Sequence, residues 1–274
     1  MHTSNQELMA YLTSCRAEEF CFVVQLCRSR FSKKSMRLCA EIPNTGAVPP
    51  ADSEERAELA GQVVDLIGRY GSNTLAYLFR KACDGKGANS YYRITHDIAK
   101  LMRSSLKKKD RPKLAHAPPL RELEELIVAM ALGRMRRELT VEETEQLLRE
   151  AGLGNKAPIA AAKFHGSWAI GSAALPTLVK LLGKKTVTVM INHVLVGATG
   201  KLLGKQAATA MAKRLVIKFP QKLFAKLVSV VGWALLVADV VALGTSPARR
   251  ITGKVVPFIA VCRVSARMEQ DRQE

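Results

Sequence analysis

Acidic residues are almost missing from the second half of this 274-residue chain. Residues 151–266 contain sixteen lysines and arginines but a single acid, Asp239. The rest of the chain carries 26 basic and 23 acidic side chains, so it is nearly balanced in charge. Such an excess of positive charge predicts an anionic partner, whether a lipid surface, a nucleic acid or an acidic protein.

Aromatic residues are also scarce, at 5% of the chain. The phenylalanines and tryptophans of the basic half are scattered, and its lysines interrupt apolar runs instead of gathering on a polar helix. No zinc-finger, homeodomain or RRM signature is present. Nucleic acid therefore stays open as a partner, but the composition favours it less than a membrane.

The six cysteines form no CxxC pair, although metal sites often contain one. Cys15, Cys21 and Cys27 are six residues apart, so on a helix they point in different directions. Their apolar neighbours favour buried free thiols in a reducing cytoplasm. His165 and His193 stand in apolar runs, which indicates hydrogen-bonded core histidines instead of metal ligands. We therefore predict no metal and no cofactor.

Catalytic and phosphate-binding motifs are not evident either. The loop Cys83–Asn89, CDGKGAN, has glycines and a lysine, but it does not match a Walker loop, and an ordinary helix–helix turn explains it better. Cys83, His96 and Asp97 contain the residue types of a catalytic triad. However, adjacent His96 and Asp97 point about 100° apart on a helix, so neither orients the other. We expect no enzyme. The first residues also lack the basic and apolar regions of a signal peptide.

Apolar residues recur at helical spacing along the chain, so we predict an all-α fold. The exception is TVTVMI, residues 186–191, where threonine and valine favour a strand. A lysine- and proline-rich segment with few large apolar groups predicts a linker. The expected parts are a helical N-terminal domain (1–104), this linker (105–119), an amphipathic helical pair (120–154) and a glycine- and alanine-rich, apolar and strongly basic helical region (155–274).

Capping residues predict where several helices begin. Ser4, followed by Glu7, suggests a capping box, and Thr140 is predicted to cap a helix of the amphipathic pair. Asp52 is predicted to cap the helix that follows the Pro/Gly-rich loop at 40–52. The buried stripe of that helix is expected to contain Leu59, Val63, Leu66 and Ile67.

The longest apolar run is 227–244, LVSVVGWALLVADVVALG, in which Asp239 is the only charge. Its length approaches the ~20 residues that span a bilayer, but an acid inside it costs about 2.5–3.5 kcal/mol. Three interpretations stay open: a permanent span, a helix in a water-soluble core, and a conditional inserter that pairs with 186–217. In the last two, Asp239 is a buried charge that needs a partner, such as Arg249 or Arg250.

Two of these three interpretations bring the basic half to a bilayer. Cations between its apolar segments would then meet anionic lipid, at about 1 kcal/mol each. The predicted contacts with a membrane or another anionic partner are Lys201, Lys205, Lys213, Arg214 and Lys218.

Several blocks resemble a known family. The helical pair at 4–27, the segment from Ala57 through RYGSNTLAYLFR to YYRITHDIAKLM, and the closing RITGKVVPFIAVCR at 250–263 are similar to the YaaW-type family of uncharacterised bacterial proteins. That family usually has proline where Lys254 stands. By sequence it is grouped with ubiquinol–cytochrome c chaperones. The resemblance implies a mainly helical bacterial protein and supplies no catalytic residue.

We therefore expect a non-enzymatic helical protein, in the cytoplasm or at the inner membrane, whose C-terminal half associates with membrane or with membrane-protein segments. The alternatives are an assembly chaperone for membrane-protein subunits, a membrane-permeabilising stress or defence effector, and a nucleic-acid-binding protein. The client, the trigger and the oligomeric state do not follow from the sequence.

Overall fold

The computed structural model describes residues 3–27, 49–70, 90–104, 106, 108, 111–112, 116–166, 168–171, 173–203, 205–214 and 247–270. Within these ranges every regular element is a helix, so the predicted all-α fold is confirmed. The TVTVMI segment lies in helix α11 (Lys184–Leu203), although it was the weakest part of that prediction. Five of its six residues are buried there, and tertiary packing overrides the strand preference of threonine and valine.

The chain forms two compact units that do not follow the order of the sequence. The first comprises Met1–Ile98 and Ala238–Ile259, and the second comprises Ala99–Val237 and Ala260–Glu274. Helices α6 (Tyr91–Ser104) and α14 (Pro247–Gln270) each contribute residues to both units. The division at 104, 119 and 154 stays a prediction.

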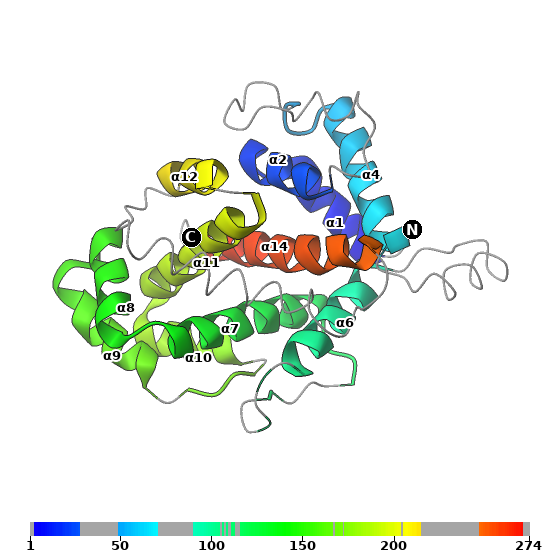
Figure 1. Ribbon diagram of the computed structural model, residues 1–274. Coiled ribbons are helices and arrows are strands. Elements are labelled where there is room, and N and C mark those ends of the chain that lie inside the picture. Colours follow the sequence, from blue (N-terminus) through cyan, green and yellow to red (C-terminus); the bar gives the residue numbers. More distant parts are fainter. Residues whose placement is uncertain are drawn as a thin grey trace. The chain divides into compact units, whose positions relative to one another are not determined.

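The first unit is built from α1 (Thr3–Ser14), α2 (Ala17–Leu26), α4 (Glu54–Tyr70) and the adjoining parts of α6 and α14 (Figure 1). Helix α1 packs against α4, and both bury apolar stripes. Leu59, Val63 and Ile67 are buried as predicted, and Leu66 is half-buried. The ring of Phe22 in α2 meets that of Phe258 in α14 edge-on, with centroids 6.4 Å apart.

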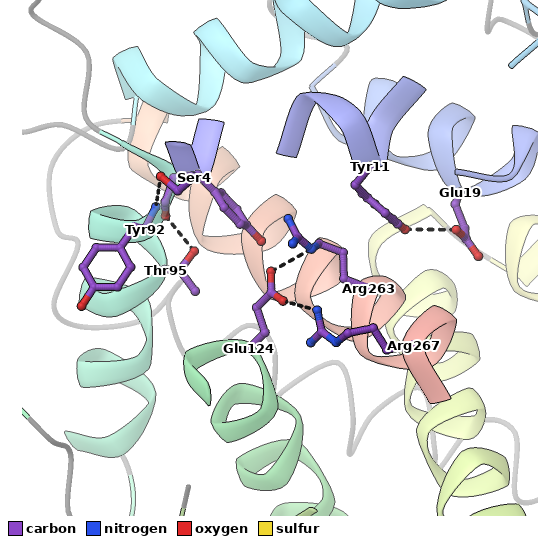
Figure 2. A network of polar contacts seen from close by, with 9 residues as sticks. Ser4, Tyr11, Glu19, Tyr92, Thr95, Glu124, Arg263 and Arg267 are labelled. Carbon is purple, nitrogen blue, oxygen red and sulfur yellow. Dashed lines mark hydrogen bonds and ion pairs between the residues drawn. The ribbon is translucent and has the colours of Figure 1, made fainter. Parts of the chain in front are cut away.

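Two of the three predicted caps are wrong. Ser4 lies inside α1, where its hydroxyl accepts a hydrogen bond from the backbone N–H of Tyr92 at 3.3 Å (Figure 2). The first turn of α1 therefore satisfies N–H groups that open α6. Asp52 has a left-handed backbone (φ 62°), and Ser53 caps α4 by accepting from the N–H of Arg56 at 3.2 Å.

The cap at Thr140 is confirmed. Thr140 Oγ1 accepts from the N–H of Glu143 at 3.2 Å, and the Glu143 carboxylate accepts from the N–H of Thr140 at 2.8 Å. This reciprocal pair satisfies two N–H groups that have no partner within the helix. The helix thus begins where the sequence predicts.

Arg56 is the largest fully buried side chain among the described residues of the first unit, with only 1% of its surface exposed. Its Nε donates to the carbonyl of Leu12 at 3.1 Å, its Nη1 donates to that of Pro49 at 3.3 Å, and its Nη2 donates to that of Cys15. The guanidinium also lies over the ring of Phe20, 4.4 Å from its centroid. Arg56 therefore closes the C-terminal end of α1, whose last carbonyls need donors from outside the helix.

The second unit contains α7 (Leu120–Glu138), α8 (Val141–Leu148), α9 (Ala157–His165), α10 (Ala174–Leu182), α11 and α12 (Lys205–Arg214) (Figure 1). A π-helical turn (Arg149–Leu153) and a 3₁₀ turn (Gly154–Lys156) connect α8 to α9. Gly152 and Gly154 have φ of 82° and 51° in these turns. Glycine adopts such angles without strain, so these two residues let α9 fold back on α8.

Helix α11 is the central element of this unit. Almost all of its described side chains from 186 to 200 are buried, on every side of the helix. It packs against α7, α10 and α12, as a helix that is apolar around its whole circumference must. Asn192 accepts a 2.8 Å hydrogen bond from Ser265 of α14, which fixes the register of those two helices.

No helix in the described part of the chain combines the length and the apolar character needed to cross a membrane. The run at 227–244, with Asp239, lies outside the described residues, and so does Lys218. The three interpretations of that run therefore stay open.

Candidate functional site

A buried acid joins α7 to α14 within the second unit. Glu124 has no exposed surface, and its two oxygens are 3.1 Å from Arg263 Nε and 2.7 Å from Arg267 Nη1 (Figure 2). The two arginines are four residues apart, so they lie on one face of α14. One carboxylate thus holds two guanidinium groups, and the cluster carries a net positive charge.

A cavity of about 210 Å³ adjoins this cluster, between α7, α10, the start of α11 and α14. We call it the cationic cavity. Arg121, Glu125, Lys184 and Arg267 supply its charged lining. Its apolar lining consists of Leu175, Pro176, Val179, Val264 and Met268.

The charges of the cationic cavity do not balance. Of its four charged lining residues three are basic, and the acid, Glu125, already accepts a 2.8 Å ion pair from Arg121 Nε. Arg121 is 70% exposed, so it lies at the solvent edge of the cavity. Lys184 is the first residue of α11, where the helix dipole adds further positive potential.

Arg267 has a donor left over. Its Nη1 binds Glu124, while its Nη2 is buried and has no hydrogen-bond partner in the part of the chain that the structure describes. Buried donors of this kind are rare in proteins, because an unmet N–H loses its bond to water and gains nothing. An anionic oxygen is the natural partner for such a guanidinium.

The sequence did not identify this site. Its members come from four helices, and Glu124 and Arg263 are separated by 139 residues in the chain. Arg263 is the final arginine of the segment 250–263 on which the family resemblance partly rests. One signal was available: Glu124 precedes Ile127 and Val128 by three and four residues, which aligns it with the apolar face of its helix.

The predicted contact cations lie on other elements. Lys201 is in the last turn of α11, Lys205 begins α12, and Lys213 and Arg214 end it. Helices α11 and α12 pack together, and Lys205 is exposed. Lys205, the one of them whose side chain the structure describes, does not line the cationic cavity.

A second, more open hollow of about 770 Å³ lies beside α9. Arg136 lines it, with its guanidinium 4.5 Å from the centroid of the Trp168 ring. Its Nη1 donates to the carbonyls of Gly166 and Trp168 at 3.0 and 3.2 Å. These contacts hold the segment after α9 against α7. They satisfy Arg136 internally, so the hollow is better explained as structural than as a ligand site.

His165 and His193 are hydrogen-bonded within the fold, as predicted. His165 Nε2 lies 2.9 Å from Thr144 Oγ1, whose own proton goes to the carbonyl of Thr140. Burial and the nearby charge of Arg136 lower the pKa of His165. His193 Nδ1 is 2.7 Å from the carbonyl of Val189, which can only accept, so Nδ1 carries the proton.

His193 should make the protein sensitive to acid. Burial lowers its pKa from 6.5 to about 4. The unfolded chain therefore takes up this proton first, so the stabilisation is complete above pH 6.5 and is lost as the pH falls towards 4. We expect the parent to lose about 3 kcal/mol more than His193→Gln over that range, in urea unfolding at several pH values. Equal losses in both proteins would contradict this.

The sequence candidates for catalysis are not assembled by the described residues. Cys83 and its loop, Cys83–Asn89, lie outside them. His96 Nδ1 and Asp97 Oδ1 are 4.0 Å apart, too far for a hydrogen bond, and the His96 ring instead stacks on Tyr92. Adjacent positions on α6 thus keep the two groups apart, as the helical geometry predicts.

The described cysteines are buried, as predicted. Cys15, Cys21, Cys27 and Cys262 are free thiols. Burial raises the pKa of Cys27 to about 12, so this thiol stays protonated and unreactive at neutral pH. Within the described ranges, no three histidine, cysteine or acidic side chains come together as a metal site would require.

Comparison of the chain with protein-family models, with curated proteins and with solved structures finds no match. The resemblance to the YaaW-type family therefore stays a prediction.

Proposed function

We propose that the second unit associates with an anionic membrane surface from the cytoplasmic side, without catalysing a reaction. The observation that carries this proposal is the sign of the exposed charge. Helices α9, α10, α11 and α12 contain lysines and an arginine but no aspartate or glutamate. Among them Lys163, Lys180, Lys185 and Lys205 are exposed, and no acidic residue stands between Lys163 and Lys205 in the sequence.

The size of the effect is sufficient for reversible binding. A basic side chain near an anionic bilayer contributes about 1 kcal/mol, so four exposed lysines supply about 4 kcal/mol, or roughly a thousandfold in the binding constant. This attraction falls off within about 10 Å at 0.1 M salt. The proposed binding is therefore peripheral and salt-sensitive.

An exposed apolar side chain accompanies these charges. Ile159 of α9 is 62% exposed. Lys156, at the end of the 3₁₀ turn, precedes it by three residues, and Lys163 of α9 follows it by four; both lysines are exposed. Isolated exposed isoleucines are ordinary on soluble proteins. Between two lysines, however, this one is suited to an interface where head groups meet acyl chains.

Neutralising the five predicted contact cations should weaken vesicle binding. The variant replaces Lys201, Lys205, Lys213, Arg214 and Lys218 with glutamine. We expect its partitioning onto phosphatidylglycerol-containing vesicles to fall at least tenfold, and its remaining binding to depend less on salt. Flotation at several salt concentrations, with neutral phosphatidylcholine vesicles beside it, measures both effects.

A matched control separates position from net charge. The control variant replaces five exposed cations of the first 150 residues with glutamine, so it changes the net charge of the protein by the same amount. These residues are Arg16, Arg93, Lys100, Arg137 and Arg149. This control should bind like the parent. The proposal fails if both variants bind equally well or lose binding equally. It also fails if the parent ignores lipid and binds DNA with a steep salt dependence.

A further inference from the structure

The cationic cavity has the two-sided lining of a site for an amphiphile. Its apolar residues come from α10 and from the C-terminal part of α14. Its charged residues come from α7, from the start of α11 and from Arg267 of α14. A purely ionic ligand would leave the apolar wall without a partner. A purely apolar ligand would bury Arg267 and Lys184 beside a surface that cannot bind them.

The charge next to the cavity calls for an anion. Glu124 is shared by two arginines, and Glu125, the one acid among the described lining residues, is paired with Arg121. Arg267 Nη2 still has no described hydrogen-bond partner. The Arg267 side chain lines the cavity and is 24% exposed, so a carboxylate or phosphate oxygen there would give its guanidinium a second charge-assisted hydrogen bond beside the one to Glu124.

The volume limits the size of the ligand. About 210 Å³ equals the volume of roughly seven waters in the liquid. It is smaller than the 300–1,000 Å³ typical of pockets that enclose a whole drug-sized molecule. The cavity therefore suits a short amphiphile, or the head and first carbons of a longer one.

We propose that the cationic cavity binds the acidic group of an anionic amphiphile, a carboxylate or phosphate carried on an apolar chain. Arg267 and Lys184 bind the anionic oxygens, and Val179, Val264 and Met268 contact the first carbons. This site is separate from the exposed lysines that carry the proposed membrane association. It uses neither those lysines nor the five cations replaced in the vesicle variant, so each proposal can fail without the other.

Titration calorimetry with octanoate, below its micelle concentration, tests the site. Octyl phosphate shares its chemistry, and 1-octanol has the same chain without the charge. We expect saturable binding of octanoate and octyl phosphate, and at least tenfold weaker binding of 1-octanol. Saturation by 1-octanol at the same concentrations, or no saturable octanoate binding by the full-length protein, would overturn the proposal.

Neighbouring lysines on α11 provide a matched pair of variants. Lys184 lines the cavity and is half-buried, while Lys185 is exposed and does not line it. We expect Lys184→Gln to weaken octanoate binding about five- to tenfold and Lys185→Gln to change it less than twofold. Equal losses in the two variants would show binding to general surface charge and reject the cavity.

A third variant tests the apolar wall without touching a charge. Val179 is half-buried on α10, and Val179→Phe should fill part of the cavity. We expect it to weaken octanoate binding at least tenfold while circular dichroism stays that of the parent. An affinity like that of the parent would overturn the proposal. Arg267→Gln is less suitable, because it also breaks the pair with Glu124.

Vesicle flotation of Lys184→Gln then identifies the source of the amphiphile. If the cavity takes the head of a bilayer lipid, this variant loses flotation together with octanoate binding. If it takes a free amphiphile, the variant floats like the parent and loses octanoate binding only. Both results support the site; the first identifies its ligand as a bilayer lipid, and the second identifies it as a free amphiphile.

Discussion

Replacing Glu124 with alanine is expected to lower the free energy of unfolding by about 3–5 kcal/mol. Its carboxylate is fully buried between Arg263 and Arg267, with the closer contact at 2.7 Å. The substitution leaves two guanidinium groups without the carboxylate that they share, and water has little access to this site to take its place. Urea unfolding followed by circular dichroism measures the loss.

The adjacent acid provides the control. Glu125 pairs with Arg121, which is 70% exposed, so Glu125→Ala should cost only about 0–1 kcal/mol. The two substitutions remove the same side chain from neighbouring positions of one helix, and only burial and pairing differ. Similar losses in the two variants would show that the Glu124 cluster does not stabilise the second unit as the geometry implies.

The second large effect is expected at Arg56. Arg56→Ala removes the donors to the carbonyls of Leu12 and Cys15, and it empties the space beside the ring of Phe20. Each buried carbonyl left without a donor costs about 1–3 kcal/mol, so we expect a total loss of roughly 3–4 kcal/mol. Thermal unfolding and hydrogen exchange of α1 amides both report this change.

Charge alone should not substitute for the guanidinium. Arg56→Lys keeps the positive charge but cannot donate to three separate carbonyls with the same geometry, so it should recover less than half of the loss. Arg93, which is exposed on α6, is the control, and Arg93→Ala should change stability by less than about 0.5 kcal/mol. Full recovery by lysine would mean that the hydrogen-bond geometry at Arg56 is unimportant.

Local patterns in the sequence predicted the helices and failed at contacts between them. The stripe of α4 and the cap at Thr140 depend on residues within a few positions of each other, and both are confirmed. Ser4 has the chemistry of a cap, but the N–H that it binds belongs to Tyr92, 88 residues away. The residues around Ser4 therefore do not reveal that its hydroxyl caps a different helix.

The candidate site was beyond reach for the same reason. The segment LRELEEL offers three glutamates, and only the helical phase relative to Val128 and Ala131 marks Glu124 as the one that turns inward. Its partners, Arg263 and Arg267, follow an apolar run and look like the basic end of a helix. The positive charge of the second half pointed to its exposed lysines, although the half-buried Arg263 contributes to the same charge.

The composition of the first unit also has a consequence during protein synthesis. Phe22 packs against Phe258, and the unit includes 238–259, so part of its core is translated long after the rest. At 5–20 residues per second, the ribosome needs on the order of ten seconds to pass from Ile98 to Ala238. Over that interval the apolar stripes of α1, α2 and α4 are exposed without their final partner. During synthesis these early helices therefore have to avoid aggregation until α14 emerges from the ribosome.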